Sequence, residues 1–254
     1  MKRIRIIGLC LVAVFAMSAV AVASASAEAP EIGRCKKVTV KKTGKYSSAT
    51  CTALKASGEY EWTAGAAKTG FTGHGTTSTL ETVGKAKVVC EEENATGEYT
   101  GAKTVGNVKV SFGKHCKAEG TFECENGHGA GILETNTLSG ELRWEKKALK
   151  KIALDLVPAT APLFIEFTCG PITIKVKGSI LVNIKAGKME TKPIQKYSGL
   201  KGKQKPEFYE TAGGEKVKDI LESENSIGKK FEQAGQTVTN TQTNEEALEA
   251  NWFV

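Results

Sequence analysis

The sequence has few of the residues on which catalysis usually depends. Of its 28 acidic residues only Asp155 and Asp219 are aspartates, and its only histidines are His74, His115 and His128. No Gly-x-Ser-x-Gly segment is present, so the nucleophile elbow of an α/β-hydrolase is absent. No pair of glutamates is marked by the sequence as the acid and base of a glycosidase. We therefore assign no catalytic, cofactor-binding or metal-binding residue, and the sequence favours a protein that is not an enzyme.

Arginine is also scarce, which argues against nucleic acid as a partner. Arg3, Arg5, Arg34 and Arg143 are the only arginines among 35 basic residues. Proteins that read nucleic acids rely on the two-pronged hydrogen bonding of arginine. The formal charge is +7, and glutamates are interleaved with the lysine clusters, a pattern typical of a solvated surface. We expect no nucleic-acid partner, while binding of these lysines to anionic polymers of a cell envelope stays open.

Long apolar runs are missing except at the N-terminus. Three basic residues lie within the first five positions, residues 6–27 carry no charge, and the stretch ends in Ala25-Ser26-Ala27. This order is typical of a cleavable signal peptide over residues 1–27, cut between Ala27 and Glu28. The alternative is an uncleaved anchor, because the uncharged stretch is long enough to span a bilayer. We expect a secreted or cell-envelope protein with no stable membrane anchor after cleavage.

The cysteines predict an oxidised protein. Six of them lie beyond residue 27, and an even number in an exported chain favours disulfides. Six cysteines allow 15 pairings, and sequence alone does not choose among them. The pairing that closes short local loops and joins the remaining two cysteines is Cys35–Cys51, Cys116–Cys124 and Cys90–Cys169. The alternative is that some of these cysteines stay reduced and pack as small apolar residues.

One cluster of histidine and cysteine invites a zinc interpretation. His115, Cys116, Cys124 and His128 fall within 14 residues. Their spacing does not match a zinc knuckle, and export favours oxidation of the cysteines over metal binding. We therefore expect no metal there. His74 lies in a turn-like, glycine-rich loop and is expected to face solvent.

Most of the remaining sequence has the pattern of β-strands. Apolar and polar residues alternate with period two over 107–112, and most clearly over 172–177 and 180–184, on either side of Gly178-Ser179. Residues 163–169 are apolar enough to be covered on both faces. Further strand candidates are 37–41, 59–63, 85–91, 98–100, 131–135, 140–145, 216–221 and 246–254. The sequence predicts an all-β or mainly β fold, either an antiparallel β-sandwich or a partly closed barrel, with at most one or two short helices.

Residues 145–157 form the one ambiguous segment. Leu149, Ile152 and Leu156 have helical spacing, whereas Ile152, Leu154 and Leu156 have strand spacing. We interpret the segment as a hairpin with its lysine-rich part near the turn, and a helix is the alternative.

Residues 28–254 are expected to form a single mainly β domain. The most polar stretch, 186–216, is interpreted as a surface excursion, and the alternative is a boundary before a smaller C-terminal piece. The apolar tail, 246–254, is expected to add a closing strand, because an apolar end is more stable in a sheet than in solvent.

Several segments resemble a family of uncharacterised exported β-rich proteins of high-GC Gram-positive soil bacteria. The segments that carry the resemblance are 44–49 (GKYSSA), 80–84 (LETVG), 96–101 (TGEYTG), 144–147 (WEKK), 202–207 (GKQKPE) and 242–249 (QTNEEALE). The resemblance implies export by a bacterium. It implies no activity, site or ligand.

Three functions follow as hypotheses. The first is a secreted non-enzymatic protein that acts through its surface, in the cell envelope or outside the cell. The second is a carrier of a small apolar ligand, which predicts that the inward face of residues 172–184 lines a cavity. The third is a glycan-processing enzyme, which predicts two glutamates in a cleft.

Overall fold

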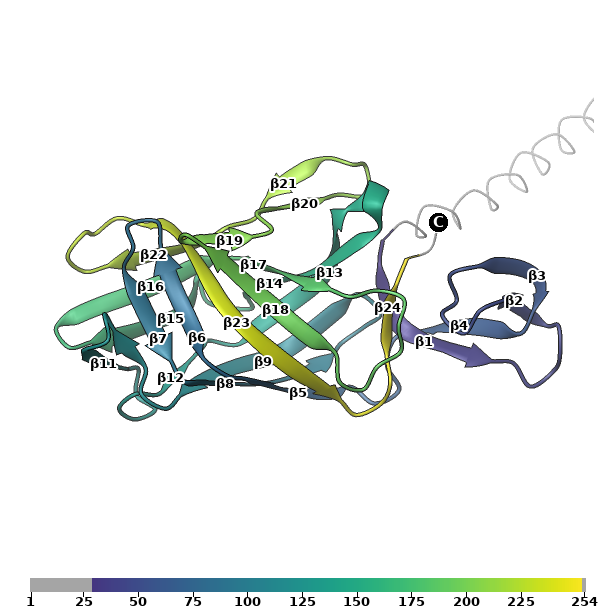
Figure 1. Ribbon diagram of the computed structural model, residues 1–254, viewed down its shortest axis with the longest axis horizontal. Helices are drawn as coiled ribbons and strands as arrows, with labels where there is room; N and C mark the ends of the chain where they lie inside the picture. The colour runs from purple at the N-terminus through teal and green to yellow at the C-terminus, as the bar shows by residue number, and fades with distance from the viewer. Residues whose placement is uncertain (1–28, 253–254) are drawn as a thin grey trace, which may run out of the picture.

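Residues 29–252 are described by the structure, a computed structural model, and they fold almost entirely into β-strands (Figure 1). The one helical element in this range is a short 3₁₀ turn, Lys147–Leu149. In the same range no helix is long and apolar enough to cross a membrane. The prediction of an all-β or mainly β antiparallel fold is confirmed, and of its two forms, a sandwich or a partly closed barrel, the structure has a barrel, which is fully closed. The predicted signal peptide, with its cleavage site between Ala27 and Glu28, lies outside the described residues.

Eight antiparallel strands close into a barrel (Figure 1). Each strand hydrogen-bonds to the next around the ring, and the last strand returns to the first. A ring of this size leaves an interior that side chains can fill or that can hold one small ligand. In ring order the strands are β5 (Gly70–Gly75), β8 (Glu92–Tyr99), β9 (Thr104–Gly113), β13 (Leu138–Lys146), β14 (Lys151–Pro158), β17 (Ile180–Ile184), β18 (Ile194–Leu200) and β23 (Glu232–Asn244).

A second ring of antiparallel strands continues from the barrel and shares β23 with it. The first half of β23 pairs with strands of this second ring, and the second half pairs with β5 and β18 of the barrel. The other strands of the second ring are β6 (Ser78–Thr82), β7 (Lys87–Cys90), β10 (Lys117–Ala118), β11 (Phe122–Glu125), β15 (Leu163–Cys169), β16 (Ile172–Gly178) and β22 (Leu221–Asn225). Further short strands are β12 (Leu133–Glu134), β19 (Lys203–Lys205), β20 (Phe208–Glu210) and β21 (Lys216–Lys218).

A small N-terminal sheet projects from the other end of the barrel (Figure 1). Cys35 and Cys51 form a disulfide within this sheet, as the sequence predicts. The C-terminal tail supplies one of the strands and pairs with the first strand of the chain, so the predicted closing strand is present. In sheet order the strands are β24 (Glu249–Asn251), β1 (Glu31–Lys37), β4 (Tyr60–Ala64), β2 (Gly44–Tyr46) and β3 (Leu54–Gly58).

The other two disulfides join different cysteines from those expected. Cys90 is bonded to Cys116, and Cys124 is bonded to Cys169. The expected pairs Cys116–Cys124 and Cys90–Cys169 are therefore wrong. Cys124 lies opposite Cys116 on one side and Cys169 on the other, and it is bonded to the one more distant in sequence, so sequence distance does not decide the pairing. Three disulfides in one chain suggest an oxidising, extracellular environment.

The strongest strand predictions agree with the structure. Residues 172–184 form β16 and β17 with a break at Gly178-Ser179, and residues 163–169 form β15. Phe164 and Ile165 are both buried, so β15 is covered on both faces as predicted. The ambiguous segment is the hairpin β13–β14, and its lysine-rich part forms the 3₁₀ turn.

The strand predicted at residues 37–41 is wrong. β1 ends at Lys37, whose partner Tyr60 is the first residue of β4, so no neighbouring strand extends further to pair with the alternating residues. The chain turns instead, with Lys42 at a φ of 64° and the Thr43 hydroxyl donating to the Val40 carbonyl at 2.8 Å. The polar stretch 186–216 also differs from a simple surface excursion, because it contains the barrel strand β18.

Candidate functional site

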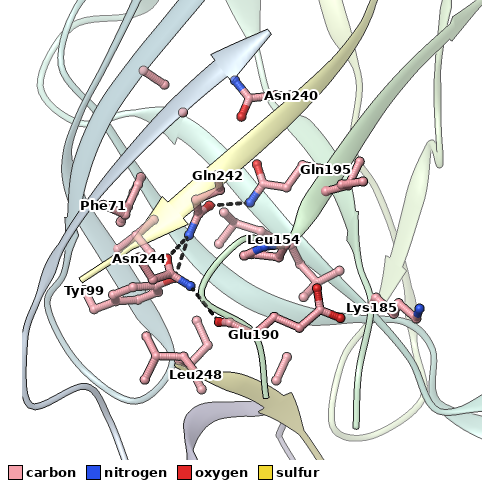
Figure 2. Close-up of a pocket in the computed structure, with 18 of the residues that line it drawn as sticks. Phe71, Tyr99, Leu154, Lys185, Glu190, Gln195, Asn240, Gln242, Asn244 and Leu248 are labelled. Carbon is pink, nitrogen blue, oxygen red and sulfur yellow. Dashed lines mark hydrogen bonds between the residues drawn. The ribbon is translucent and has the colours of Figure 1, made fainter. Parts of the chain in front are cut away.

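The interior of the eight-stranded barrel holds a cavity of about 410 Å³ (Figure 2). This volume falls in the range of small-ligand pockets. Apolar side chains from many strands form most of its wall, namely Ile32, Phe71, Val105, Val108, Val110, Leu142, Leu154, Leu156, Ile184 and Leu248. Polar side chains gather mainly on β18, β23 and the segments that close one end, namely Tyr99, Gln195, Tyr197, Asn240, Gln242, Asn244, Glu190 and Glu249.

Small residues on the inner face of β5 and β8 keep this part of the barrel open. Gly73 and Ala95 face each other across the two strands and both line the cavity. A Cβ at Gly73 would lie 2.8 Å from Asn240 Oδ1 and 3.1 Å from the Ala95 Cβ, so glycine also lets the Asn240 amide approach the backbone. The second ring is filled differently: a void among Phe164, Phe167 and other apolar side chains there has a volume of only about 60 Å³.

β23 contributes the polar side of the cavity through a strict alternation. Asn240, Gln242 and Asn244 are buried and point inward, whereas the threonines between them are exposed. Successive side chains of a strand point to opposite faces, so every second residue lines the interior. Figure 2 shows these three amides in a row with Gln195 of β18 beside them. The strand places amide side chains inside the barrel where an apolar residue is the usual choice.

The amides and Tyr99 form one hydrogen-bonded chain (Figure 2). The Asn244 amide nitrogen donates to the backbone carbonyl of Glu190 at 3.5 Å. The Tyr99 hydroxyl donates to Asn244 Oδ1 at 2.9 Å, and Gln242 Nε2 lies 2.6 Å from both the Tyr99 oxygen and Asn244 Oδ1. Gln195 Nε2 donates to Gln242 Oε1 at 2.5 Å. Burial raises the pKa of Tyr99 to about 12, so its hydroxyl keeps its proton.

Glu93 marks the boundary between the hollow barrel and the packed second ring. Its side chain is 3 % exposed, and burial raises the pKa of its carboxyl group. One oxygen accepts from Asn240 Nδ2 at 2.9 Å, and the other accepts from Gln236 Nε2 at 3.0 Å. Gln236 Nε2 also lies 3.2 Å from the hydroxyl of Ser78. Two amide side chains of β23, Gln236 and Asn240, therefore donate hydrogen bonds to this buried carboxyl group.

A second buried carboxyl group lies at the end of the cavity beside the N-terminal sheet. Glu249 is 2 % exposed and lines the cavity, and its Oε1 accepts from Asn251 Nδ2 at 2.8 Å. Its Oε2 is buried and has no hydrogen-bond partner among residues 29–252. Burial raises the pKa of Glu249 to about 7. A buried acceptor without a donor is unfavourable, which makes this oxygen a point where a ligand could bind.

The barrel is joined least firmly between β17 and β18. This ladder has a single register pair, Asn183 with Lys196, whereas neighbouring ladders have more. Residues on both sides of this seam line the cavity, among them Ile184 and Ile194. The segment 186–193 then folds across the end of the barrel and bonds to Leu248 through the backbone of Glu190.

The histidines considered from the sequence lie away from this cavity. His74, His115 and His128 are all exposed. His74 contacts Asn94 on the outer face of the barrel, at 3.0 Å from its Nδ1. The sulfurs of Cys116 and Cys124 are bonded in disulfides, so the zinc interpretation loses its thiolates.

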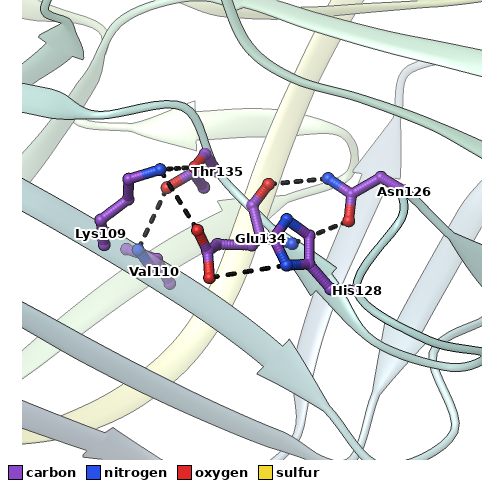
Figure 3. A network of polar contacts seen from close by, with 6 residues as sticks. All are labelled: Lys109, Val110, Asn126, His128, Glu134 and Thr135. Carbon is purple, nitrogen blue, oxygen red and sulfur yellow. Dashed lines mark hydrogen bonds and ion pairs between the residues drawn. The ribbon is translucent and has the colours of Figure 1, made fainter.

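Figure 3 shows that His128 belongs to a structural network of polar contacts. The Glu134 carboxyl group lies 3.2 Å from Lys109 Nζ and 4.0 Å from the His128 ring. The Asn126 side chain holds the backbone of Glu134 through both its amide nitrogen and its oxygen, at 2.8 and 3.1 Å. These contacts fix the loop before β12 and leave no open site.

The two aspartates of the chain meet outside the barrel wall. Asp155 of β14 and Asp219, which follows β21, are both buried, at 8 % and 3 % exposure, and lie close enough for the charge of one to act on the other. Arg143 Nε lies 3.6 Å from Asp155 Oδ2. Burial and the neighbouring Asp155 raise the pKa of Asp219 to about 7, so the pair keeps a proton that separate aspartates would lose. Because the pair lies under the β20–β21 hairpin, it is not open to a substrate.

Comparison with known proteins gives no relative on which to base a function: no family model, no curated protein and no solved structure matches this chain. The geometry of the cavity therefore carries the functional argument.

The polar residues of this cavity lack the apolar periodicity that predicts the other strands. Asn240, Gln242 and Asn244 were not in any expected strand, because β23 alternates threonine with amides and a pattern based on apolar residues does not detect it. The signal that was available is the repeated Thr-x spacing from 237 to 243, since threonine favours strands and period two defines one.

Proposed function

We propose that the protein binds a small ligand with an apolar body inside the eight-stranded barrel. The observation that supports the proposal is the cavity of about 410 Å³ with a mainly apolar wall. Of the inward apolar face of residues 172–184, which the carrier hypothesis places at the cavity, only Ile184 lines it, and the rest of that face packs elsewhere.

The protein works as an exported carrier in this proposal. The pattern of residues 1–27 supports export, and the three disulfides fit an oxidising compartment. The resemblance to exported actinobacterial proteins fits the same location, in the cell envelope or the medium.

The test is a binding titration of the mature protein with the fluorescent apolar probe N-phenylnaphthylamine. We expect saturable binding of one probe per chain, followed by fluorescence and by calorimetry. Absence of saturable binding, or binding at many weak sites, contradicts the proposal.

Two neighbouring positions on β8 provide a matched pair of variants. Ala95 faces the cavity and Thr96 is exposed on the opposite face. Ala95→Trp puts an indole into the cavity and should weaken probe binding by at least about tenfold, a loss of about 1.4 kcal/mol. Thr96→Trp adds the same group outside and should leave binding unchanged. Equal effects from the two variants place the probe somewhere other than the cavity.

Glycan processing is the second candidate, and one observation favours it. Glu190 and Glu249 both line the cavity, and glycosidases use a pair of carboxyl groups. Glu190 is paired with Lys188 at 2.8 Å, whereas Glu249 is buried with a raised pKa. Release of reducing sugar from envelope polysaccharide that disappears in Glu249→Gln would favour this function over the carrier.

A surface-acting, non-enzymatic role remains the third candidate. It draws support only from the lysine-rich exterior, which suits anionic envelope polymers.

A further inference from the structure

We infer that the cavity selects an apolar molecule that carries hydrogen-bond donors, a hydroxyl or an amino group, and discriminates against molecules whose polar groups only accept. This inference rests on the proposed function and adds the class of ligand. It follows from the direction in which the buried amide side chains of the cavity are fixed, and not from the lysines of its wall, Lys185, Lys188 and Lys192.

The amide chain is oriented by a group that can only accept. The backbone carbonyl of Glu190 accepts from Asn244, which fixes the nitrogen of that amide toward it and leaves Oδ1 for the Tyr99 hydroxyl and Gln242 Nε2. Gln242 then presents its oxygen to Gln195 Nε2. The last free atom of this chain is the oxygen of Gln195, which accepts no hydrogen bond from residues 29–252 and belongs to a residue that lines the cavity.

The amide of Asn240 is also held by an acceptor at its nitrogen, which leaves its oxygen free. The Glu93 carboxyl group accepts through both oxygens, so it holds Asn240 Nδ2 as a donor. Asn240 Oδ1 is left facing the cavity region and accepts no hydrogen bond within the described part of the chain. Figure 2 shows the side chains of Asn240 and Gln195 on neighbouring strands, above the Gln242 amide.

Glu249 adds a third acceptor at the far end when its carboxyl group, whose pKa burial raises to about 7, is ionised. Its Oε2 is buried without a partner, although the residue lines the cavity. Three oxygens on three different strands therefore lack donors: those of Gln195, Asn240 and Glu249. A ligand hydroxyl or amine can donate hydrogen bonds to these oxygens, whereas a ligand carboxylate or ether would place its own acceptor oxygen against them.

The test measures how four ligands of the same chain length displace the fluorescent probe from the mature protein near neutral pH. Decanol and decylamine carry donors, decyl methyl ether only accepts, and decanoate accepts and carries a negative charge. We expect the better of the two donor ligands to bind at least about tenfold more tightly than both the ether and decanoate, a difference of about 1.4 kcal/mol. A preference below tenfold overturns the inference.

A matched pair of variants on β18 tests the residue assignment. Gln195→Met keeps the approximate shape of the side chain and removes its free oxygen together with the nitrogen that donates to Gln242, and Lys196→Met introduces the same side chain at the exposed neighbour. Gln195→Met should lower the preference for the donor ligand over the ether by at least about threefold, a difference of about 0.7 kcal/mol. Lys196→Met should preserve that preference, and equal preferences in the two variants contradict the role of Gln195.

The outcomes separate this inference from the proposed function. Probe binding that Ala95→Trp abolishes, without a preference for donors, refutes the ligand class and leaves the carrier function in place. No saturable probe binding in the wild-type protein refutes both.

Discussion

Replacing Asp219 with asparagine should stabilise the protein at alkaline pH. Asp219 is 3 % exposed, and it shares a buried contact with Asp155 on the outside of the barrel. Arg143 faces Asp155 at 3.6 Å, so the charge of the pair is held by Asp155 and the shared proton by Asp219. Asparagine has nearly the size of the protonated aspartic acid and can donate to Asp155 without carrying a charge.

The magnitude follows from the pKa of Asp219. This pKa is raised from 3.8 to about 7, a difference that corresponds to about 4 kcal/mol. The folded chain keeps a proton that the unfolded chain releases, so the free energy of unfolding falls as the pH rises from about 4 to about 7. Above about pH 7 both aspartates are ionised in the folded protein, and the free energy of unfolding is lower by the whole of this difference. Asp219→Asn should therefore raise the free energy of unfolding by about 2 to 4 kcal/mol at alkaline pH and change it little below pH 4.

The assay is urea denaturation of the oxidised protein at several pH values between 4 and 9, followed by tryptophan fluorescence. Glu166→Gln is the matched control, because its carboxyl group is 52 % exposed and should not affect the slope. If Asp219→Asn has the same pH dependence of unfolding as the wild-type protein, the shared proton does not exist and the reasoning fails.

Two further predictions concern groups at either end of the molecule. Glu249→Gln should also stabilise the protein above neutral pH, since burial raises the pKa of Glu249 to about 7 and the ionised form is then buried at a cost. Urea denaturation measures the change in the free energy of unfolding, and an unchanged stability at alkaline pH would contradict the burial of this carboxyl group. The double variant Cys124→Ala with Cys169→Ala opens a loop of 45 residues and should lower the free energy of unfolding by about 4 kcal/mol, while probe affinity at low temperature stays the same because neither cysteine lines the cavity. Loss of probe affinity in a variant that still folds would couple the second ring to the cavity.

The sequence predicted the parts of the fold in which apolar residues alternate. Residues 172–184 place apolar side chains on one face, and that face packs against the interior in both β16 and β17. The hairpin at 145–157 was favoured because Ile152, Leu154 and Leu156 share a face, and all three are buried inside the barrel. Burial of one face is what produces such a pattern, so it is visible wherever the face is apolar.

The same logic explains why the cavity side of β23 was invisible. Its inner face is made of Gln236, Val238, Asn240, Gln242 and Asn244, of which only Val238 is apolar. A polar inner face has no hydrophobic periodicity, although its backbone geometry is that of an ordinary strand. The residues most useful for inferring function were therefore those that least resembled a core.

The prediction of two of the three disulfide pairs was wrong for a topological reason. Cys116 and Cys124 lie opposite each other across the β10–β11 hairpin, where the Cys124 N–H donates to the Cys116 carbonyl at 2.8 Å, but each bonds to the cysteine on its other side, Cys90 or Cys169. Cys124 pairs across β15, which lies about 40 residues later in the chain and is adjacent only after the ring closes. Local loop length has no information about that closure.

The distribution of packing between the two rings supports a binding role for the barrel. Both disulfides that join distant strands of the body lie in the second ring, where the separations of 26 and 45 residues correspond to about 3.5 and 4 kcal/mol of stabilisation. That ring also holds Phe164 and Phe167 in a core with little free volume. The barrel has no disulfide between its own strands in the described range, keeps Gly73 and Ala95 on its inner wall and contains the large cavity. A cavity costs stability because its wall lacks packing contacts. The disulfides of the second ring add stability to the same chain, and this gain offsets the cost of the cavity in the barrel.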